Sequence, residues 1–236
     1  MRIPQFELET RPVAAGRCFI EDTVVIADEL VAIRMDDVLD PDYASFLADH
    51  LARGIHYERD EIGDTKRVSR ARRLGDMPDS PIATAAAPDM TALDALDMFV
   101  SPWWLDQLSR WLGQPLEVLR PTTPYRMDVG DYIDPHDDCP APEYRLSVVC
   151  NFTADWTSGD GGETVVGLVE DVVEYDDSDW FFPLKKWTLR PETRQLAPRF
   201  NSALLLPLAP TRAHAVRPVQ RGSRFSITTL YGGIER

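Results

Sequence analysis

The second half of this chain is divided into short β-type segments by Pro, Gly and Asp, and this punctuation constrains the fold most. β-branched and aromatic residues dominate the segments, a composition that favours strands. About eight such segments occupy residues 116–119, 125–129, 132–133, 145–152, 163–169, 202–208, 214–216 and 224–231. Short strands at this spacing predict a β-sandwich or jelly-roll barrel whose alternate side chains point inward.

The first half is more mixed in character. Residues 23–27 and 30–34 are β-type runs that predict a hairpin or two edge strands. Asp40-Pro41 is a helix start, and apolar residues at 3–4 spacing follow it as far as Gly54. Residues 57–89 show no sustained period and are expected to form a long loop region.

Two further helices are expected at residues 91–100 and 103–112, packed on the outside of the β-core. The chain is therefore predicted to be mainly β with flanking α-helices. Residues 1–120 would form supporting strands and helices, and residues 121–236 the core. His50, on the packed face of the first helix, and His56, just after it, are expected to have structural roles.

The formal net charge of −14 at pH 7 argues against nucleic acid as a partner, because Lys and Arg supply most of that affinity. No apolar run is long enough for a membrane helix, and residues 1–7 lack the zones of a signal peptide. The three cysteines form no Cys-x-x-Cys motif. This pattern predicts a protein of the reducing cytoplasm, without structural zinc.

His136 and Asp138 lie two residues apart, so an extended backbone would point both side chains to the same side. His214 would reach them from another strand. Two imidazoles and one carboxylate leave adjacent coordination positions open, the facial arrangement of iron(II) enzymes that bind a co-substrate and dioxygen. Zinc usually has a more closed tetrahedral set of ligands.

Arg224 follows His214 by ten residues and is embedded in an apolar β-type run. We expect the two runs to be adjacent antiparallel strands, with His214, Arg224 and Ser226 on one inward face. The planar guanidinium pairs bidentately with a carboxylate, which a lysine cannot do. Together with the metal ligands, this arginine predicts a site for a dicarboxylate co-substrate.

From here the chain resembles the iron(II)- and 2-oxoglutarate-dependent oxygenases, in particular their prolyl-hydroxylase-like branch. The resemblance covers roughly residues 120–233 and is carried by several motifs in order. They are Tyr125 with Gly130-Asp131-Tyr132, His136-x-Asp138, Arg145 to Phe152, Trp156 with Gly161-Gly162-Glu163-Thr164, Pro198 to Asn201, His214-Ala215-Val216 with Pro218-Val219, and Gly222 to Ile227.

The resemblance implies a double-stranded β-helix (a jelly-roll, cupin-like core) and a set of site residues. His136, Asp138 and His214 would bind Fe(II), and Arg224 and Tyr125 would hold the distal carboxylate of 2-oxoglutarate. Ser226 and Ser147 would be further co-substrate contacts. The implied reaction consumes O2 and converts 2-oxoglutarate to succinate and CO2 while hydroxylating an unactivated C–H bond; desaturation and cyclisation stay open.

The substrate is expected to be a small molecule such as a free or carrier-tethered amino acid. A protein or peptide side chain is the alternative, and a non-catalytic metal-binding barrel is a third reading. The excess of Arg over Lys, with frequent Ala, is typical of GC-rich bacteria and of their specialised metabolism. Residues 170–197, rich in acidic and aromatic side chains, predict either a lid that favours a cationic substrate or a solvated acidic loop.

Overall fold

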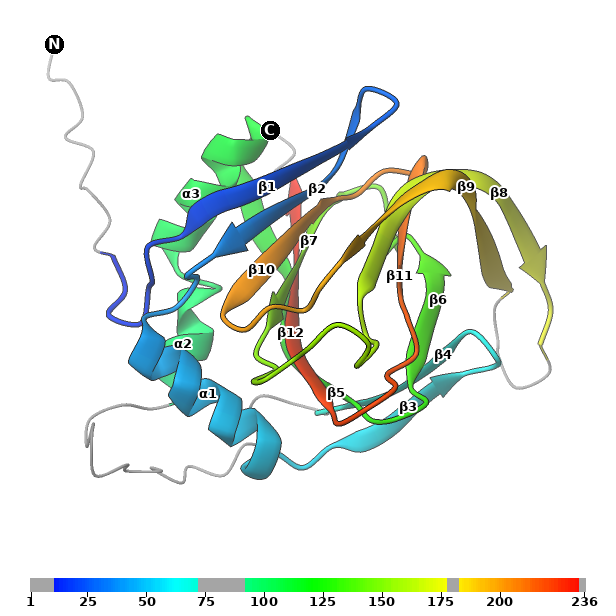
Figure 1. Ribbon diagram of the computed structural model, residues 1–236. Helices are drawn as coiled ribbons and strands as arrows, with labels where there is room; N and C mark the ends of the chain where they lie inside the picture. Colours follow the sequence, from blue (N-terminus) through cyan, green and yellow to red (C-terminus); the bar gives the residue numbers. More distant parts are fainter. Residues whose placement is uncertain (1–10, 72–91, 178–182, 234–236) are drawn as a thin grey trace, which may run out of the picture.

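Twelve antiparallel strands form one sheet that curls into a nearly closed barrel in this computed structural model, which describes residues 11–71, 92–177 and 183–233 (Figure 1). The strands are β1 (Phe19–Ile26), β2 (Glu29–Asp36), β3 (Glu58–Ile62), β4 (Lys66–Arg70), β5 (Leu116–Met127), β6 (Tyr132–His136), β7 (Tyr144–Asn151), β8 (Thr164–Tyr175), β9 (Leu184–Leu196), β10 (Ser202–Pro207), β11 (Arg212–Val216) and β12 (Arg224–Gly233).

The order of the strands divides the barrel into two facing walls. One wall is β1-β2-β10-β7-β12-β5 and the other is β6-β11-β8-β9, and β4 joins them by pairing with both β5 and β6. β3 pairs only with β4. This arrangement confirms the predicted mainly-β fold with a double-stranded β-helix core.

Helices α1 (Pro41–Arg53), α2 (Ala92–Met98) and α3 (Pro102–Leu112) cover the outer face of the first wall (Figure 1). The Asp40 carboxylate caps α1, and the Ser101 hydroxyl caps α3. Leu47 and Trp104 share a buried cluster with Tyr231 of β12. The indole N–H of Trp104 donates to the Tyr231 hydroxyl at 2.9 Å. The helices therefore support the wall that carries β12, as predicted.

The expected loop over residues 57–89 was wrong in its first part, because β3 and β4 form a hairpin there; residues 72–91 lie outside the described part of the chain. These strands are built from charged residues, which hydrophobic periodicity does not detect. Opposite charges stabilise them instead: Lys66 Nζ lies 2.8 Å from Asp60 Oδ2. Such pairs stabilise a hairpin modestly.

Residues 170–175 and 184–196 were expected to interrupt the barrel pattern, but they continue strands β8 and β9. The two strands pair from Thr164↔Leu196 to Tyr175↔Leu184. Glu170 to Glu174 are all exposed, so the strand has no apolar face there that a sequence pattern could reveal. Asp179 and the aromatic run Trp180 to Phe182 lie outside the described residues.

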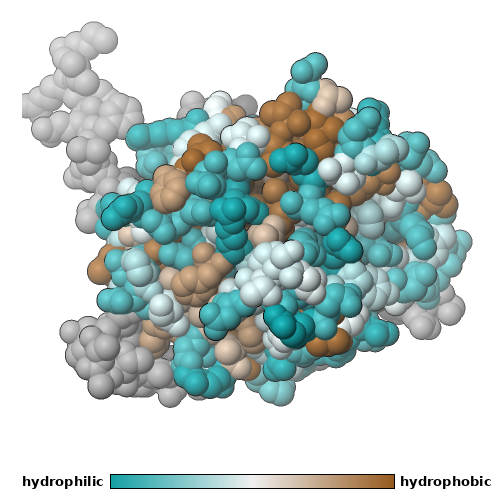
Figure 2. All heavy atoms as spheres, viewed as in Figure 1, coloured by the Kyte–Doolittle hydropathy of each residue, from teal (hydrophilic) through white to brown (hydrophobic). Residues whose placement is uncertain are grey.

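The surface is mainly polar in the view of Figure 2, where the apolar atoms gather over the β1–β2 hairpin. The exposed large apolar residues of β1 are Phe19, Ile20 and Val25. None of the helices in the described ranges is long and apolar enough to cross a membrane.

His50 is buried on the packed face of α1, as the sequence predicted, and neither ring nitrogen has a hydrogen-bond partner among the described residues. Gly54 makes room for the ring, since a Cβ at that position would lie 2.3 Å from His50 Nδ1. Burial lowers the pKa of His50 below its ordinary value of 6.5. The folded protein therefore keeps this imidazole neutral at a pH where the unfolded chain takes up a proton.

We expect stability to fall as the pH drops below about 6.5, by at most about 1.4 kcal/mol per pH unit from this residue. His50→Leu should flatten that dependence. The measurement is the Tm of metal-free wild-type and variant protein between pH 7.5 and 5.5. Parallel Tm curves for the two proteins would show that His50 does not titrate on unfolding.

Candidate metal and co-substrate site

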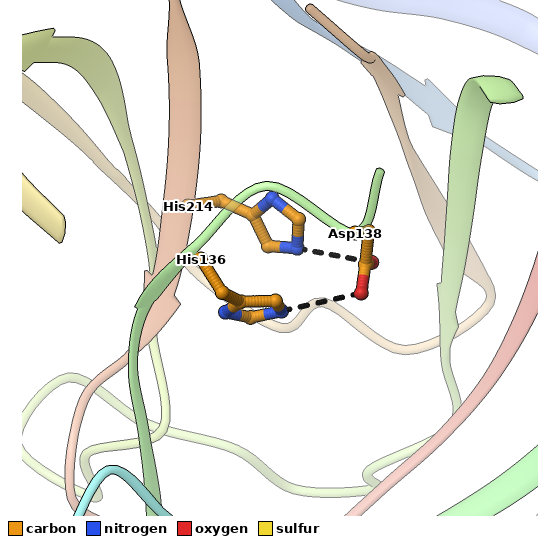
Figure 3. Close-up of side chains that lie close together, drawn as sticks. All are labelled: His136, Asp138 and His214. Atoms are coloured by element: carbon orange, nitrogen blue, oxygen red, sulfur yellow. Dashed lines mark ion pairs between the residues drawn. The ribbon is translucent and has the colours of Figure 1, made fainter. Parts of the chain in front are cut away.

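The side chains of His136, Asp138 and His214 converge inside the barrel (Figure 3). His136 is the last residue of β6, and His214 lies directly opposite it on β11. His136 Nε2 is 3.4 Å from Asp138 Oδ1, and His214 Nε2 is 3.3 Å from Asp138 Oδ2. Two donor atoms about 2.1 Å from a metal and at right angles lie about 3 Å apart, so the spacing suits neighbouring ligands of one ion.

Hydrogen bonds to His136, at the end of β6, and to Asp138, in the turn after it, favour metal binding. His136 Nδ1 lies 3.0 Å from the Asp134 carbonyl oxygen, which only accepts, so Nδ1 carries the proton and Nε2 keeps its lone pair. The Ser147 hydroxyl donates to Asp138 Oδ2 at 2.9 Å. Such outer contacts fix the orientation of ligands and are a regular feature of metal sites.

Asp138 reaches the two histidines by a route that the sequence did not predict. The strand ends at His136, and Asp138 has a φ of +50°, in the left-handed region. An extended backbone was the wrong reason for the convergence. Aspartate tolerates the left-handed conformation better than most residues, and here the turn directs the carboxylate back towards the imidazoles.

The protonation states of two residues in this cluster are those of metal ligands. Burial would raise the pKa of Asp138, but His136 and His214 outweigh it and hold that pKa well below its ordinary value. Burial, together with the charge of His136, lowers the pKa of His214. Burial also opposes the charged form of His136, but Asp138 raises its pKa overall. Asp138 is thus an anion and His214 a neutral imidazole, the forms that bind metals.

Arg224 begins β12 and is 4% exposed. Its Nη2 donates to Asn151 Oδ1 at 3.0 Å, and its Nη1 lies 3.5 Å from Ser226 Oγ, while its Nε has no partner among the described residues. Burial lowers the pKa of Arg224 to about 10. No carboxylate of the described residues pairs with this buried cation, and an anionic ligand would satisfy it.

Tyr125 lies on β5 directly opposite Ser226, and Met127 lies opposite Arg224. Burial raises the pKa of Tyr125, which keeps its hydroxyl protonated and able to donate. Ser226 and Tyr125 therefore flank Arg224, as the sequence suggested. Ser147 contacts Asp138 instead and does not line the cavity, so its position suits orientation of the metal ligand rather than contact with the co-substrate.

The expected pairing of the strands that carry His214 and Arg224 was wrong. β11 pairs with β6 and β8, whereas β12 pairs with β5 and β7. The two residues belong to opposite walls and line one cavity between them. The link from Arg217 to Ser223 crosses from one wall to the other. The even spacing of His214 and Arg224 along the chain therefore did not mean that their strands are neighbours.

The cavity has a volume of about 470 Å³ and connects the three proposed metal ligands with Arg224. Its wall on the side of β4 and β9 includes Ile62, Lys66, Ile133, Leu184, Lys185 and Trp187. The sequence pattern assigned no role to Thr164 or Asn151. The buried hydroxyl of Thr164 has no hydrogen-bond partner among the described residues, and Asn151 accepts a hydrogen bond from Arg224. Both belong to motifs already named above, but only the register across strands brings them to the site.

Gly161 and Gly162 have positive φ values of 75° and 74°, and Gly162 packs beside Arg224. A Cβ on Gly162 would lie 3.0 Å from Arg224 Cδ, and one on Gly161 would lie 2.2 Å from the Pro218 carbonyl oxygen. The glycine pair is thus required by both backbone conformation and close approach. It lets the chain cover the stem of the arginine.

Comparison with known families gives a match over residues 122–232 to the 2OG-Fe(II) oxygenase superfamily. Residues 122–232, which form most of the barrel, carry the sequence pattern of this superfamily. The matched residues contain the histidine and aspartate cluster and Arg224, and the cluster is of a kind that can hold a metal ion. The protein is accordingly a dioxygenase that uses Fe(II), 2-oxoglutarate and O2. No curated protein matches the sequence.

Solved structures share the fold at low sequence identity. A Pseudomonas putida prolyl-4-hydroxylase is 15% identical, with a TM-score of 0.57, and the match covers 86% of this chain and 93% of that one. A Trichoplax adhaerens prolyl hydroxylase in complex with a hypoxia inducible factor peptide is also 15% identical, with a TM-score of 0.58 and coverage of 86% and 83%. The viral collagen prolyl hydroxylase of Paramecium Bursaria Chlorella virus-1 is 12% identical, with a TM-score of 0.52 and coverage of 89% and 100%.

Proposed function

We propose that this oxygenase hydroxylates an unactivated C–H bond of a small metabolite, such as a free or carrier-tethered amino acid. The reaction would consume O2 and 2-oxoglutarate and release succinate and CO2. The observation that carries the proposal is the buried, uncompensated Arg224 in the same cavity as His136, Asp138 and His214. An unpaired buried cation is costly, and an anionic ligand beside the metal would stabilise it.

In this proposal His136, Asp138 and His214 bind Fe(II), which supplies the oxygen activation when bound. Arg224 pairs with the distal carboxylate of 2-oxoglutarate, with Ser226 and Tyr125 as additional donors. Asn151 holds one arm of the guanidinium, and Ser147 holds one oxygen of Asp138. The chain's own contribution is to orient the ligands and to exclude water from the buried end of the cavity.

The size of the cavity supports a small substrate. A volume of about 470 Å³ is at the lower end of the range for pockets that bind small molecules, and it must also hold the co-substrate. A peptide side chain that enters from outside is the alternative, favoured by the peptide bound to the Trichoplax relative. A screen of succinate release against amino acids, small acids and blocked peptides separates the two substrate classes.

An anaerobic titration tests the proposed site. Fe(II) and 2-oxoglutarate together should produce a metal-to-ligand charge-transfer band, and admission of air should produce succinate. A protein that shows neither the band nor succinate would refute the assignment of these residues.

We also propose that the β8–β9 hairpin acts as a lid over the cavity. Leu184, Lys185 and Trp187 of β9 line the cavity, and Lys186 Nζ lies 3.9 Å from Asp64 Oδ2 beyond the end of β3. The acidic residues of β8 were expected to face a cationic substrate, but none of the described ones lines the cavity. The lid would therefore contribute an aromatic and a basic side chain rather than acidic ones.

Trp187→Ala is expected to raise the KM for the substrate several-fold, because an indole that lines the cavity is lost, while the KM for 2-oxoglutarate and the iron content stay nearly constant. Val173→Ala is the matched control, since Val173 is 54% exposed on the same hairpin and does not line the cavity. Unchanged kinetics of the tryptophan variant would rule out the lid.

The described cysteines Cys18, Cys139 and Cys150 are all free, which supports the proposed cytoplasmic location. A place in bacterial specialised metabolism remains a prediction from composition alone.

A further inference from the structure

Among the described residues, four lysine and arginine side chains line the cavity, namely Lys66, Arg120, Lys185 and Arg224. Two of them already have acidic partners. Lys66 Nζ lies 2.8 Å from Asp60 Oδ2, and Lys185 Nζ lies 3.5 Å from Glu174 Oε1. Arg224 has the co-substrate as its proposed partner. Arg120 is exposed and makes no ion pair or hydrogen bond within the described part of the chain, so one cation of the cavity is left over.

The strand register places Arg120 near the metal ligands. Leu230 of β12 lies opposite Arg120 on β5 and opposite Ser147 on β7. The Ser147 hydroxyl donates to Asp138, and Leu230 lines the cavity beside Arg120. Neighbouring strands are about 4.8 Å apart, so the Arg120 and Ser147 backbones are about 10 Å apart. If the Arg120 side chain extends from β5 towards β7, its guanidinium lies within the length of a small molecule from Asp138.

Electrostatic coupling supports the same placement. Burial is the main cause of the raised pKa of Tyr125, and the charges of Asp138 and Arg120 act on that hydroxyl in opposite directions. Both charged groups therefore act on the same part of the cavity.

Arg120 and Arg224 start from backbone positions too far apart for both guanidiniums to pair with the same carboxylate group. Met127 lies opposite Arg224 at one end of the β5–β12 ladder, and Leu230 lies opposite Arg120 further along it. Positions 224 and 230 on β12 are six residues apart, a separation of about 20 Å along a strand at about 3.3 Å per residue. Because Arg224 is the proposed partner of the distal carboxylate of 2-oxoglutarate, Arg120 is left for a different carboxylate.

We propose that Arg120 binds a carboxylate of the substrate, so that the enzyme acts on a small carboxylic acid whose reacting carbon lies a few bonds from the carboxylate. This inference rests on the proposed function and specifies its substrate class. The planar guanidinium forms two parallel hydrogen bonds with a carboxylate, and the partly enclosed cavity strengthens them relative to bulk water. Arg120 would thereby fix which carbon faces the metal.

The test measures succinate release with three groups of compounds. The first group is the L-amino acids and small hydroxy and keto acids, the second is their amides and methyl esters, and the third is blocked neutral peptides. The wild-type protein should turn over an acid and use its amide at least about tenfold less well. Arg120→Gln should raise the KM for that acid about 10- to 100-fold, the loss expected for a charged hydrogen bond. It should also remove the preference for acid over amide.

Arg120→Lys should restore part of the affinity, because the charge is kept and the bidentate geometry is lost. Arg110→Gln is the control: Arg110 lies on α3 outside the barrel and is exposed, so it removes the same charge far from the cavity. The KM for 2-oxoglutarate and the iron content should be the same in all four proteins. That readout separates substrate binding from damage to the metal site.

Equal use of acids and amides, or an unchanged KM in Arg120→Gln, would overturn the carboxylate proposal. Turnover of neutral blocked peptides, with no acid accepted as a substrate, would overturn it as well. It would also be overturned if none of the acids tested were a substrate while the protein slowly formed succinate without any substrate. These results leave the oxygenase intact. Failure of the proposed function itself looks different: no charge-transfer band and no succinate under any condition.

Discussion

His214→Ala is expected to abolish both iron retention and turnover. His214 is the one proposed ligand contributed by β11, and it faces Asp138 at 3.3 Å. No other described His, Cys, Asp or Glu side chain joins the cluster to replace it. Loss of an outer partner of a ligand already lowers metal affinity about 10- to 100-fold, so loss of the ligand itself should exceed that range. The measurements are iron content after gel filtration and succinate formation in air.

His56→Ala is the matched control for this substitution. His56 is exposed, lies outside the cavity and should leave iron content and turnover unchanged. Ser147→Ala should fall between the two, because Asp138 keeps its place but loses a hydrogen bond. Retention of iron and turnover by His214→Ala would show that the histidine is not a ligand. A loss of Tm as large as that from a core substitution would instead point to unfolding.

The fold could be predicted where one face of an element is apolar. Helices α1 and α3 begin at capped, proline-containing starts, and their apolar faces pack on the barrel. Strands β3, β8 and β9 were missed or cut short because exposed and charged residues occupy them. Their pairing depends on partners across the sheet, which a local pattern does not contain.

The proposed site also divides into residues that the sequence could predict and contacts that it could not. Chemistry and spacing along the chain singled out the two histidines, Asp138 and Arg224, and the structure brings all four to one cavity. Contacts across strands could not be predicted. Ser147 bonds to Asp138 and Asn151 to Arg224, and both depend on how β7 is placed between β10 and β12. The position of Arg120 needs the same register, since nothing in its own segment marks it.

Arg224→Met is expected to weaken 2-oxoglutarate binding about 10- to 100-fold while iron binding stays intact. Methionine keeps much of the volume and removes the charge. Removal of the buried guanidinium relieves its desolvation cost but leaves Asn151 Oδ1 without its donor, so the Tm of the ligand-free protein should change little. The wild type should gain Tm on addition of Fe(II) and 2-oxoglutarate, and the variant should gain it only from the metal.

Arg224→Lys sharpens this prediction, because lysine keeps a positive charge but not the planar fork. If bidentate pairing with a carboxylate is what the residue provides, the lysine variant should recover only part of the affinity. Its shorter reach also leaves Asn151 Oδ1, now 3.0 Å from Nη2, without that donor. Full affinity in the lysine variant would mean that charge alone binds the co-substrate. Full affinity in the methionine variant would mean that 2-oxoglutarate binds elsewhere in the cavity, away from Arg224.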